Sequence, residues 1–407
     1  MATSPIHQIY TNPSARTWVS NPLPSNTSEI QAFYNSLPNF APTPLIPLPA
    51  VAKELGLKAV YVKAETSRLG LPSFKLLGVS WAIRQAIIQR ASLRPSASLE
   101  DLRAAVIKHG IKLCAATDGN HGRAVARMGM LLGVKEIKIF VPRGLDESIV
   151  RSIEEEGKGV EVLVVEGCYD VSVKVAHRWG EDNQGGMLIE GTAFEGYEDV
   201  PKWTVQGYRS MLYEIDSQLN GQVPSLVVAP VGVGSLAQAI VTHYKAPKSL
   251  VSSSPVALPP DSTQSSSSNR PSRTSILTVE PRTAASLHAS LHAGTSLTIT
   301  TAPTIMTGLE CGTISTAAWP ILKEGVDASI TVGDREVHRA VKDLEMYGAE
   351  AGPCGAAALA GLREVFGWVR GENGMGREVR EVLGLGGESV VVLICTEGRR
   401  PYAAPVL

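Results

Sequence analysis

Short apolar runs and longer amphipathic stretches alternate along most of the chain. Eight apolar runs bounded by turn-forming residues predict buried strands, at Ala59–Val62, Ile111–Ala116, Ile137–Val141, Val160–Val165, Leu226–Pro230, Ile276–Val279, Ile330–Val332 and Ser389–Cys395. Nine stretches predict helices, at Leu76–Gln89, Leu99–His109, His121–Leu132, Glu147–Glu156, Tyr169–Trp179, Trp203–Leu219, Leu236–Tyr244, Arg335–Met346 and Gly355–Phe366. Repeated strand–helix units are typical of parallel sheets covered by helices on both faces. The pattern therefore predicts an α/β fold with doubly wound, mostly parallel sheets.

Two segments depart from this alternation. Residues 1–40 are polar with scattered prolines, which predicts an N-terminal arm over the surface. Residues 246–275 contain the run Ser265–Ser268, several prolines and few large apolar groups. Such a composition cannot support a packed core, so we expect a disordered surface insertion there.

The composition of the 407 residues is that of an ordinary soluble protein, with 44% hydrophobic and 19% charged residues. The net charge is −1 and the basic residues form no runs, which argues against nucleic acid and acidic membranes as partners. No apolar run is long enough to span a bilayer. The N-terminus has no secretory apolar region, and Arg16 is its one Lys or Arg before Glu29, which favours the cytoplasm. The five cysteines are scattered without zinc-type spacing, so we expect reduced thiols and no metal.

Lys75 is the first candidate for chemistry. It follows Pro72, Ser73 and Phe74 at the start of a predicted helix. A helix N-terminus and partial burial both lower the pKa of an ammonium group, which frees its lone pair for a carbonyl. This position suits a lysine that forms a Schiff base, although taken alone Lys75 is better interpreted as an ordinary solvated lysine.

A polar loop, TDGNHG at residues 117–122, lies between a predicted strand and a predicted helix. In a doubly wound sheet such a loop lies at the carboxyl edge, where ligands bind. Its amides can hold a carboxylate at the helix N-terminus, and Asp118 can move a proton. A turn with Asn120 as helix cap explains the loop equally well, and His121 alone is better interpreted as structural.

Two further segments end predicted strands at the same edge. Gly232-Val233-Gly234-Ser235-Leu236 follows Leu226–Pro230, and its small residues let backbone N–H groups approach a phosphate. The third glycine of a dinucleotide fingerprint and the lysine of a Walker loop are both missing, so a single small phosphate fits better. Cys395 and Thr396 end the last strand with neutral hydrogen-bonding groups, although a core strand and a turn would explain them too.

In this order the four segments resemble the fold-type II pyridoxal-phosphate enzymes, a group that includes serine and threonine dehydratases, threonine synthase and the tryptophan synthase β chain. A narrower resemblance, from about Pro42 to Gly398, is to the diaminopropionate ammonia-lyases. It rests on GLPSFKLLG at 70–78, ATDGNHGR at 116–123, TAFEGY at 192–197, Trp203, QGY at 206–208, IMTGLECG at 305–312, GAEAG at 348–352 and TEG at 396–398.

The resemblance implies a role for each segment. Lys75 would hold pyridoxal 5'-phosphate as a Schiff base and act as base on the L-substrate, and Asp118 would be the second base, serving the D-isomer. Asn120 would bond the ring hydroxyl of the cofactor. The phosphate would lie on Gly232, Val233, Gly234, Ser235 and Leu236, and Cys395, with Thr396, would face the pyridine nitrogen. A neutral partner there favours prompt loss of a β-substituent over transamination.

The implied reaction and architecture follow from the same resemblance. The reaction is elimination of ammonia from 2,3-diaminopropionate or a similar small amino acid, with aminoacrylate then hydrolysing to pyruvate and a second ammonia. The resemblance also implies a homodimer, a small domain at residues 79–190 and a large one made from 41–78 and 191–407.

Two departures from the family pattern concern the substrate. An acidic residue is expected directly before the TAFEGY segment, but Gly191 stands there and Glu190 is one step away. Thr313-Ile314 replaces the Glu-Pro expected after Gly312. A serine/threonine-type dehydratase or β-replacing synthase, and a cofactor-binding protein without catalysis, are the alternatives. Asp118 favours the ammonia-lyase, because dehydratases usually have a small residue there, and intact Lys75 and Asp118 argue against a non-catalytic protein.

Overall fold

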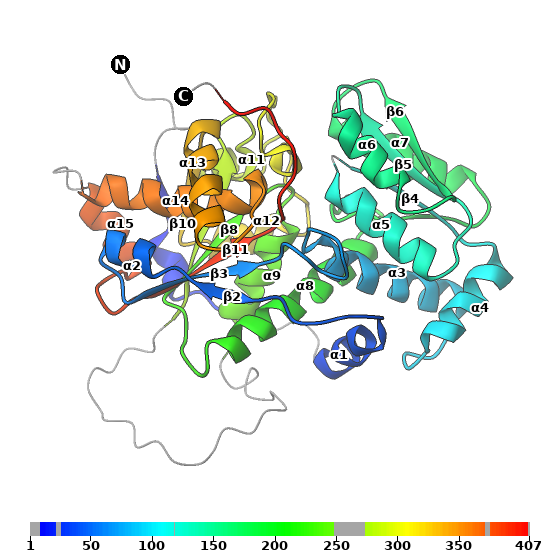
Figure 1. Ribbon diagram of the computed structural model, residues 1–407, viewed down its shortest axis with the longest axis horizontal. Coiled ribbons are helices and arrows are strands. Elements are labelled where there is room, and N and C mark those ends of the chain that lie inside the picture. Colours follow the sequence, from blue (N-terminus) through cyan, green and yellow to red (C-terminus); the bar gives the residue numbers. More distant parts are fainter. Residues whose placement is uncertain (1–8, 22–25, 118, 248–272, 371–374, 406–407) are drawn as a thin grey trace, which may run out of the picture.

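The computed structural model describes residues 9–21, 26–117, 119–247, 273–370 and 375–405. The described chain forms two sheets with helices packed around them, which lie side by side in Figure 1. The predicted α/β fold with mostly parallel sheets is confirmed. Asp118 and residues 248–272 of the predicted insertion lie outside the described residues.

The larger sheet has seven strands in the order β1-β10-β9-β8-β11-β3-β2. Their bounds are β1 Tyr10–Thr11, β2 Leu45–Pro47, β3 Ala59–Ala64, β8 Leu226–Pro230, β9 Ser275–Pro281, β10 Ala328–Val332 and β11 Val390–Cys395. The five central strands are parallel, and the short edge strands β1 and β2 pair antiparallel with their neighbours. The carboxyl ends of β3, β8 and β11 therefore meet at one edge.

The smaller sheet has four parallel strands in the order β6-β5-β4-β7. They are β4 Lys112–Ala116, β5 Ile137–Pro142, β6 Val160–Val165 and β7 Gly186–Leu188. All four lie between residues 79 and 190, the range expected for the small domain, and this part of the chain forms the right-hand side of Figure 1.

The helices connect the strands and cover the sheets. In the first half of the chain they are α1 Thr27–Ser36, α2 Pro49–Leu55, α3 Lys75–Ala91, α4 Leu99–His109, α5 Asn120–Leu131, α6 Glu147–Glu154 and α7 Tyr169–Asp182. The second half has α8 Asp199–Gln218, α9 Ser235–Tyr244, α11 Ser286–Ala293, α12 Trp319–Gly325, α13 Asp334–Met346, α14 Pro353–Arg370 and α15 Met375–Leu383. Single 3-10 turns occur at Pro13–Arg16 and Thr307–Leu309. All eight predicted strands and nine predicted helices are present, whereas three short strands and five helices among the described residues were not predicted.

The larger sheet is covered on both faces, as the continuous apolar runs of its strands require. On β11, Val391, Leu393 and Cys395 belong to one buried cluster with α13 and α14. Val390, Val392 and Ile394 belong to another, with α3, α8 and α9. Successive strand side chains point to opposite faces, so the strand divides its residues between the two cores.

Helices α3 and α8 cross very closely between the two sheets. A Cβ added at Gly207 would lie 2.5 Å from the backbone oxygen of Leu77, and one at Gly78 would lie 2.5 Å from the ring of Tyr208. Such contacts are too short for any side chain, so both glycines are needed for the crossing. The crossing holds the start of α3, and with it Lys75, against the rest of the fold.

The N-terminal segment is more integrated than the predicted surface arm. Strand β1 extends the larger sheet, and α1 buries Ile30, Phe33 and Tyr34. The hydroxyl of Tyr34 donates to the backbone oxygen of Leu77 at 2.5 Å, so α1 also braces the start of α3.

Candidate functional site

A cavity of about 330 Å³ lies where the carboxyl ends of β8 and β11 face the small sheet. Its wall includes the starts of three helices, α3, α5 and α9, and the segment that follows β11. Of the sequence-predicted site residues within the described part, all but Cys395 line this one cavity: Lys75, Asn120, Gly232, Val233, Gly234, Ser235, Leu236 and Thr396.

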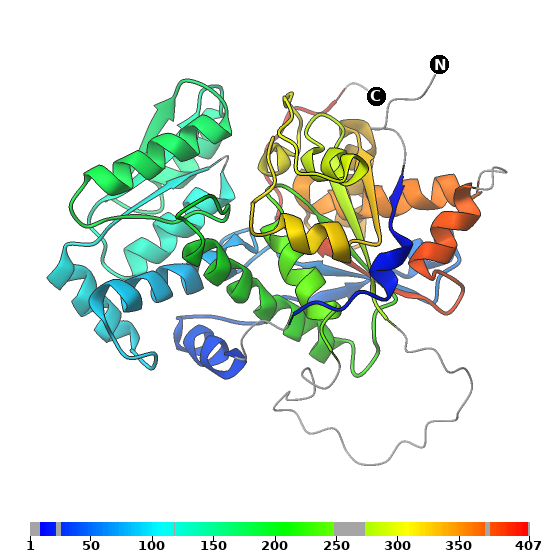
Figure 2. The same ribbon diagram turned by 180° about the vertical axis from the view of Figure 1, so that it is seen from behind.

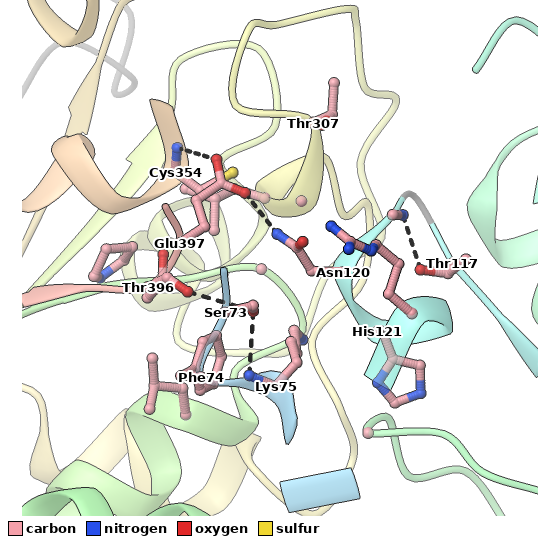
Figure 3. Close-up of a pocket in the computed structure, with 18 of the residues that line it drawn as sticks. Ser73, Phe74, Lys75, Thr117, Asn120, His121, Thr307, Cys354, Thr396 and Glu397 are labelled. Carbon is pink, nitrogen blue, oxygen red and sulfur yellow. Dashed lines mark hydrogen bonds between the residues drawn. The ribbon is translucent and has the colours of Figure 1, made fainter. Parts of the chain in front are cut away.

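Lys75 is the first residue of α3, and the segment before it is pinned to the end of β11. The backbone N–H of Phe74 donates to the oxygen of Thr396 at 3.3 Å. The N–H of Lys75 donates to the hydroxyl of Ser73 at 3.2 Å. The ammonium nitrogen of Lys75 lies 5.3 Å from the ring centroid of Phe74. Backbone bonds between these segments thus set where the amine enters the cavity (Figure 3).

The polar loop forms the N-terminus of α5. The hydroxyl of Thr117 accepts the backbone N–H groups of Gly119 at 2.9 Å and Gly122 at 3.0 Å. The N–H groups of Asn120 and His121 belong to the first turn, where a helix offers them no internal partner. The dipole of α5 adds partial positive charge there, so this loop can hold a carboxylate.

His121 lies in the cavity wall and is neutral. Its burial, together with the positive charge of Lys75, lowers the pKa of His121 to about 4. Because the neutral ring must donate to the carbonyl of Ile189, 2.7 Å from Nε2, the proton is on Nε2. Glu190 lies 3.9 Å from this nitrogen, and a neutral imidazole forms no ion pair with it.

The glycine-containing segment after β8 forms a cradle at the start of α9. Gly234 has a φ of 96°, a conformation that favours glycine. A Cβ at Gly232 would lie 3.2 Å from both the sulfur of Cys311 and the backbone oxygen of Gly308. The first N–H groups of α9 have no internal partner and carry the positive end of the helix dipole. The cradle therefore suits a phosphate group.

Cys395 and Thr396 end the same strand but point differently. Cys395 packs in the cluster with α14, and its thiol donates to the backbone oxygen of Glu397 at 3.3 Å. Burial, with Glu397 nearby, raises the pKa of the Cys395 thiol. Thr396 lines the cavity, and its buried hydroxyl has no hydrogen-bond partner among the described residues. Thr396 is therefore better placed than Cys395 to meet a ligand.

Glu397 is a part of the site that the sequence did not single out beyond its place in the TEG segment. Its carboxylate accepts a hydrogen bond from Asn120 Nδ2 at 2.7 Å and another from the backbone N–H of Cys354 at 3.0 Å. Arg400 Nε donates to it at 3.2 Å. An acidic residue two positions after a buried strand was the available signal, whereas nothing in the sequence pointed to Cys354.

The two substrate-side departures also have a place in the structure. Glu190 is fully buried in the cavity wall, and its carboxylate accepts hydrogen bonds from the N–H of Ala116 and from the hydroxyl of Tyr169 at 3.1 Å. A Cβ at Gly191 would lie 3.6 Å from the hydroxyl oxygen of Ser235, an ordinary contact. The carboxylate is thus present one residue earlier, and a side chain at position 191 would fit.

Thr313 joins the two parts of the chain. Its hydroxyl donates to Asp170 on α7 at 3.4 Å.

Within the described ranges, no group of three or more His, Cys, Asp and Glu residues is placed to hold a metal ion, and no helix is long and apolar enough to cross a membrane. All five cysteines are described, and none forms a disulfide.

Comparison with known proteins identifies the family. Residues 37–375 match the family described as pyridoxal-phosphate dependent enzyme. This chain belongs to that family. The diaminopropionate ammonia-lyase of Salmonella typhimurium is 30% identical over 389 residues, which cover 91% of this chain and 88% of that protein. The L-threonine dehydratase of Corynebacterium glutamicum is 27% identical over 331 residues, 80% of this chain and 64% of that protein.

Solved structures agree with this assignment. The crystal structure of diaminopropionate ammonia-lyase from Escherichia coli in complex with D-serine superposes with a TM-score of 0.80 at 27% identity, covering 96% of this chain and 93% of that one. The protein is therefore a pyridoxal-phosphate dependent lyase of the ammonia-lyase and dehydratase group.

The residues of the cavity fit pyridoxal phosphate. The cradle of Gly232 and Gly234 suits the phosphate, the hydroxyl of Thr396 offers a donor to a ring nitrogen, and the amine of Lys75 can join an aldehyde. These individual roles, and those of Asp118 and Asn120, stay predictions.

Proposed function

We propose that this pyridoxal-phosphate enzyme eliminates ammonia from 2,3-diaminopropionate, or from a similar small β-substituted amino acid, to give pyruvate and ammonia. The observation that carries the proposal is that Lys75, the loop of α5 and the glycine cradle of α9 open into one cavity of about 330 Å³. The relatives that bear the name diaminopropionate ammonia-lyase support the choice of substrate, because they match over nearly the whole chain.

Each wall of the cavity supplies one function. The amides of Asn120 and His121 at the start of α5 bind the substrate carboxylate. The amine of Lys75 removes the α-proton of the L-isomer. Bound pyridoxal phosphate supplies the electron sink that makes this proton acidic. The β-amino group then leaves as ammonia, and hydrolysis of the released aminoacrylate gives pyruvate and a second ammonia.

Product stoichiometry tests the substrate assignment. The purified enzyme is incubated separately with L- and D-diaminopropionate, serine and threonine, and pyruvate (2-oxobutyrate with threonine) and ammonia are both measured. We expect turnover of diaminopropionate with two ammonia for each pyruvate. Turnover of serine or threonine alone, with one ammonia for each 2-oxo acid, would replace the proposal with a dehydratase.

Lys75→Ala tests the attachment of the cofactor. The wild-type protein should absorb in the visible, and the variant should lose this band and its activity, because an alanine cannot bond an aldehyde. Lys323→Ala is the matched control, since Lys323 is a lysine on α12 outside the cavity wall. A variant at position 75 that keeps the visible band would reject the assignment.

Asp118→Asn tests the second base. The substitution removes the proton acceptor and keeps the size of the side chain, so it should reduce activity on D-diaminopropionate by roughly a hundredfold or more, as expected for loss of a general base. Activity on the L-isomer should fall much less. Equal losses on both isomers would remove the dedicated role of Asp118.

We also propose a cytoplasmic homodimer without nucleic-acid or membrane partners. The near-neutral charge and the scattered cysteines support the location and the absence of such partners, and the resemblance to the diaminopropionate ammonia-lyases supports the dimer. Sedimentation equilibrium of the purified protein would give the mass, and a value of one chain would reject the dimer.

A further inference from the structure

A buried carboxylate connects the two halves of the site. Glu397 follows β11 of the larger sheet and is 3% exposed. Asn120 begins α5, which follows β4 of the smaller sheet. The 2.7 Å bond from Asn120 Nδ2 to Glu397 Oε2 joins residues 277 positions apart in the chain. Figure 3 shows this bond between the labelled side chains of Asn120 and Glu397.

Both oxygens of Glu397 act as acceptors. Oε2 accepts from Asn120, and Oε1 accepts from the backbone N–H of Cys354 and from Nε of Arg400. A second guanidinium nitrogen of Arg400 donates to the backbone oxygen of Ile305, which fixes the arginine in turn. The carboxylate is thus held in one orientation by donors from α14 and from its own segment.

The groups around Glu397 suit a negatively charged carboxylate. Burial alone would lower the pKa of Arg400, but Glu397, together with Cys354, outweighs this effect and raises it. Burial, with Glu397 beside it, raises the pKa of the Cys354 thiol, as it does for Cys395. Arg400 is therefore the counter-ion of the carboxylate, and the thiols of Cys354 and Cys395 beside it stay protonated.

We propose that Glu397 is a positioning residue that fixes the carboxamide of Asn120 across the boundary between the two sheets. A carboxamide nitrogen has two hydrogens. Glu397 accepts one of them, so the other is presented to the cavity in a single direction. An ionised acceptor also polarises the amide and strengthens its remaining N–H as a donor. The inference rests on the proposed role of Asn120 toward the ring oxygen of the cofactor.

Glutamine cannot replace Glu397 in this arrangement. Its side chain has the same shape, but one of the two oxygens becomes an NH₂ donor. If the NH₂ faces Asn120 Nδ2, two donors oppose each other. If it faces the other way, it opposes the N–H groups of Cys354 and Arg400. In the first orientation the hydrogen bond to Asn120 is lost. In the second, the hydrogen bonds from Cys354 and Arg400 that hold the side chain at position 397 are lost.

The test is a double-mutant cycle read from cofactor binding. Glu397→Gln, Asn120→Ala and the double variant are compared with the wild type. The dissociation constant for pyridoxal phosphate and the pH midpoint of the visible band are both measured. Each single variant should weaken binding roughly tenfold and raise the midpoint by about one pH unit, because a hydrogen bond to a charged oxygen is lost. The double variant should match the singles, since both changes remove the same interaction.

Two further variants keep the test decisive. Glu345→Gln is the matched control, because Glu345 pairs with Arg399, next to Arg400, at 3.2 Å, and both side chains are exposed. It should leave binding and midpoint unchanged. Glu397→Asp keeps the charge and both acceptors but is one methylene shorter, so it should show a smaller weakening and serves if the glutamine variant does not fold.

The outcomes separate this inference from the proposed function. Losses that multiply to roughly a hundredfold in the double variant would mean that Glu397 and Asn120 act independently, and would overturn the inference. An equal loss in Glu345→Gln would do the same. Failure of the wild type to act on diaminopropionate would instead reject the proposed substrate, and the binding cycle would still report on Glu397.

Discussion

Acid should destabilise this protein through His121. Burial and the neighbouring Lys75 lower the pKa of His121 from 6.5 to about 4 in the folded chain. In the unfolded chain the imidazole is in water and keeps its ordinary value. Between these two values the unfolded state holds more protons than the folded state, so its population grows as protons are added. The stability contributed by neutral His121 is present above pH ~6.5 and is lost as the pH falls toward 4.

The magnitude follows from the size of the shift. At about 1.4 kcal/mol per pKa unit, a shift from 6.5 to about 4 corresponds to roughly 3 kcal/mol once the pH is below both values. Going from pH 7 to pH 5 covers most of the window and should remove about 2 kcal/mol through this residue. That is a large part of the stability of an ordinary domain.

The comparison that isolates His121 uses His121→Gln. Glutamine is neutral at both pH values, and its amide N–H can donate to the carbonyl of Ile189 as the imidazole does. Urea unfolding is measured at pH 7 and pH 5 for the wild type, His121→Gln and His177→Gln, each freed of cofactor so that the amine of Lys75 keeps its charge. His177 is the control, because its side chain on α7 is 35% exposed. The carboxylates titrate in the same way in both proteins. Subtracting the pH dependence of the variant from that of the wild type therefore removes their contribution to the free energy of unfolding.

Between pH 7 and pH 5, the free energy of unfolding of His121→Gln should fall by about 2 kcal/mol less than that of the wild type. His177→Gln should behave like the wild type. Equal pH dependence in the wild type and His121→Gln would refute the reasoning. A histidine resonance assigned to His121 that titrates near pH 6.5 would refute it too.

Two further predictions concern stability. Gly207→Ala should lower the free energy of unfolding by roughly 3 kcal/mol, because its Cβ would lie 2.5 Å from the backbone oxygen of Leu77 at the α3–α8 crossing. Gly367→Ala is the matched control on α14, because a Cβ there meets open space. In the same urea titration it should raise the free energy of unfolding by about 0.5–1 kcal/mol. Asp327→Asn should cost roughly 3–5 kcal/mol, because it leaves the ammonium of Lys245, 2.7 Å away and 1% exposed, buried without its counter-ion. Removing the acid of the exposed Lys58–Glu388 pair should cost less than about 1 kcal/mol, and equal losses for the two acids would contradict this reasoning.

The predicted elements were those with a strong periodic signal. The buried strands are continuous apolar runs, and helices such as α4 have both capping signals, with Ser98 and Asp101 forming a capping box and Gly110 ending the helix. Short edge strands such as β1 and β7 contain two or three residues, too few for a period to show. Helix α1 buries Ile30, Phe33 and Tyr34, whose spacing is helical, but the polar residues around them hid it.

The parts of the site that lie within a single short segment could be predicted from the sequence. Lys75, the loop of α5 and the cradle of α9 are local segments, and each follows a strand or begins a helix at the predicted place. Glu397 was not predictable in the same way, because its importance arises from its meeting with Asn120, far away in the chain. Sequence patterns report local periodicity, whereas such a meeting depends on how two sheets are placed against each other.

The choice between Cys395 and Thr396 depends on the pleat of one strand. Val391, Leu393 and Cys395 share the face toward α14, so the thiol is directed into the core, and the next side chain turns to the cavity. Glu397 follows, but its oxygens are taken by Asn120, Cys354 and Arg400. The acid nearest to Thr396 in the chain is therefore already engaged, whereas the hydroxyl of Thr396 has no hydrogen-bond partner among the described residues. The predicted contact of Thr396 with the ring nitrogen would be a neutral one, and a neutral donor would favour prompt loss of the β-substituent.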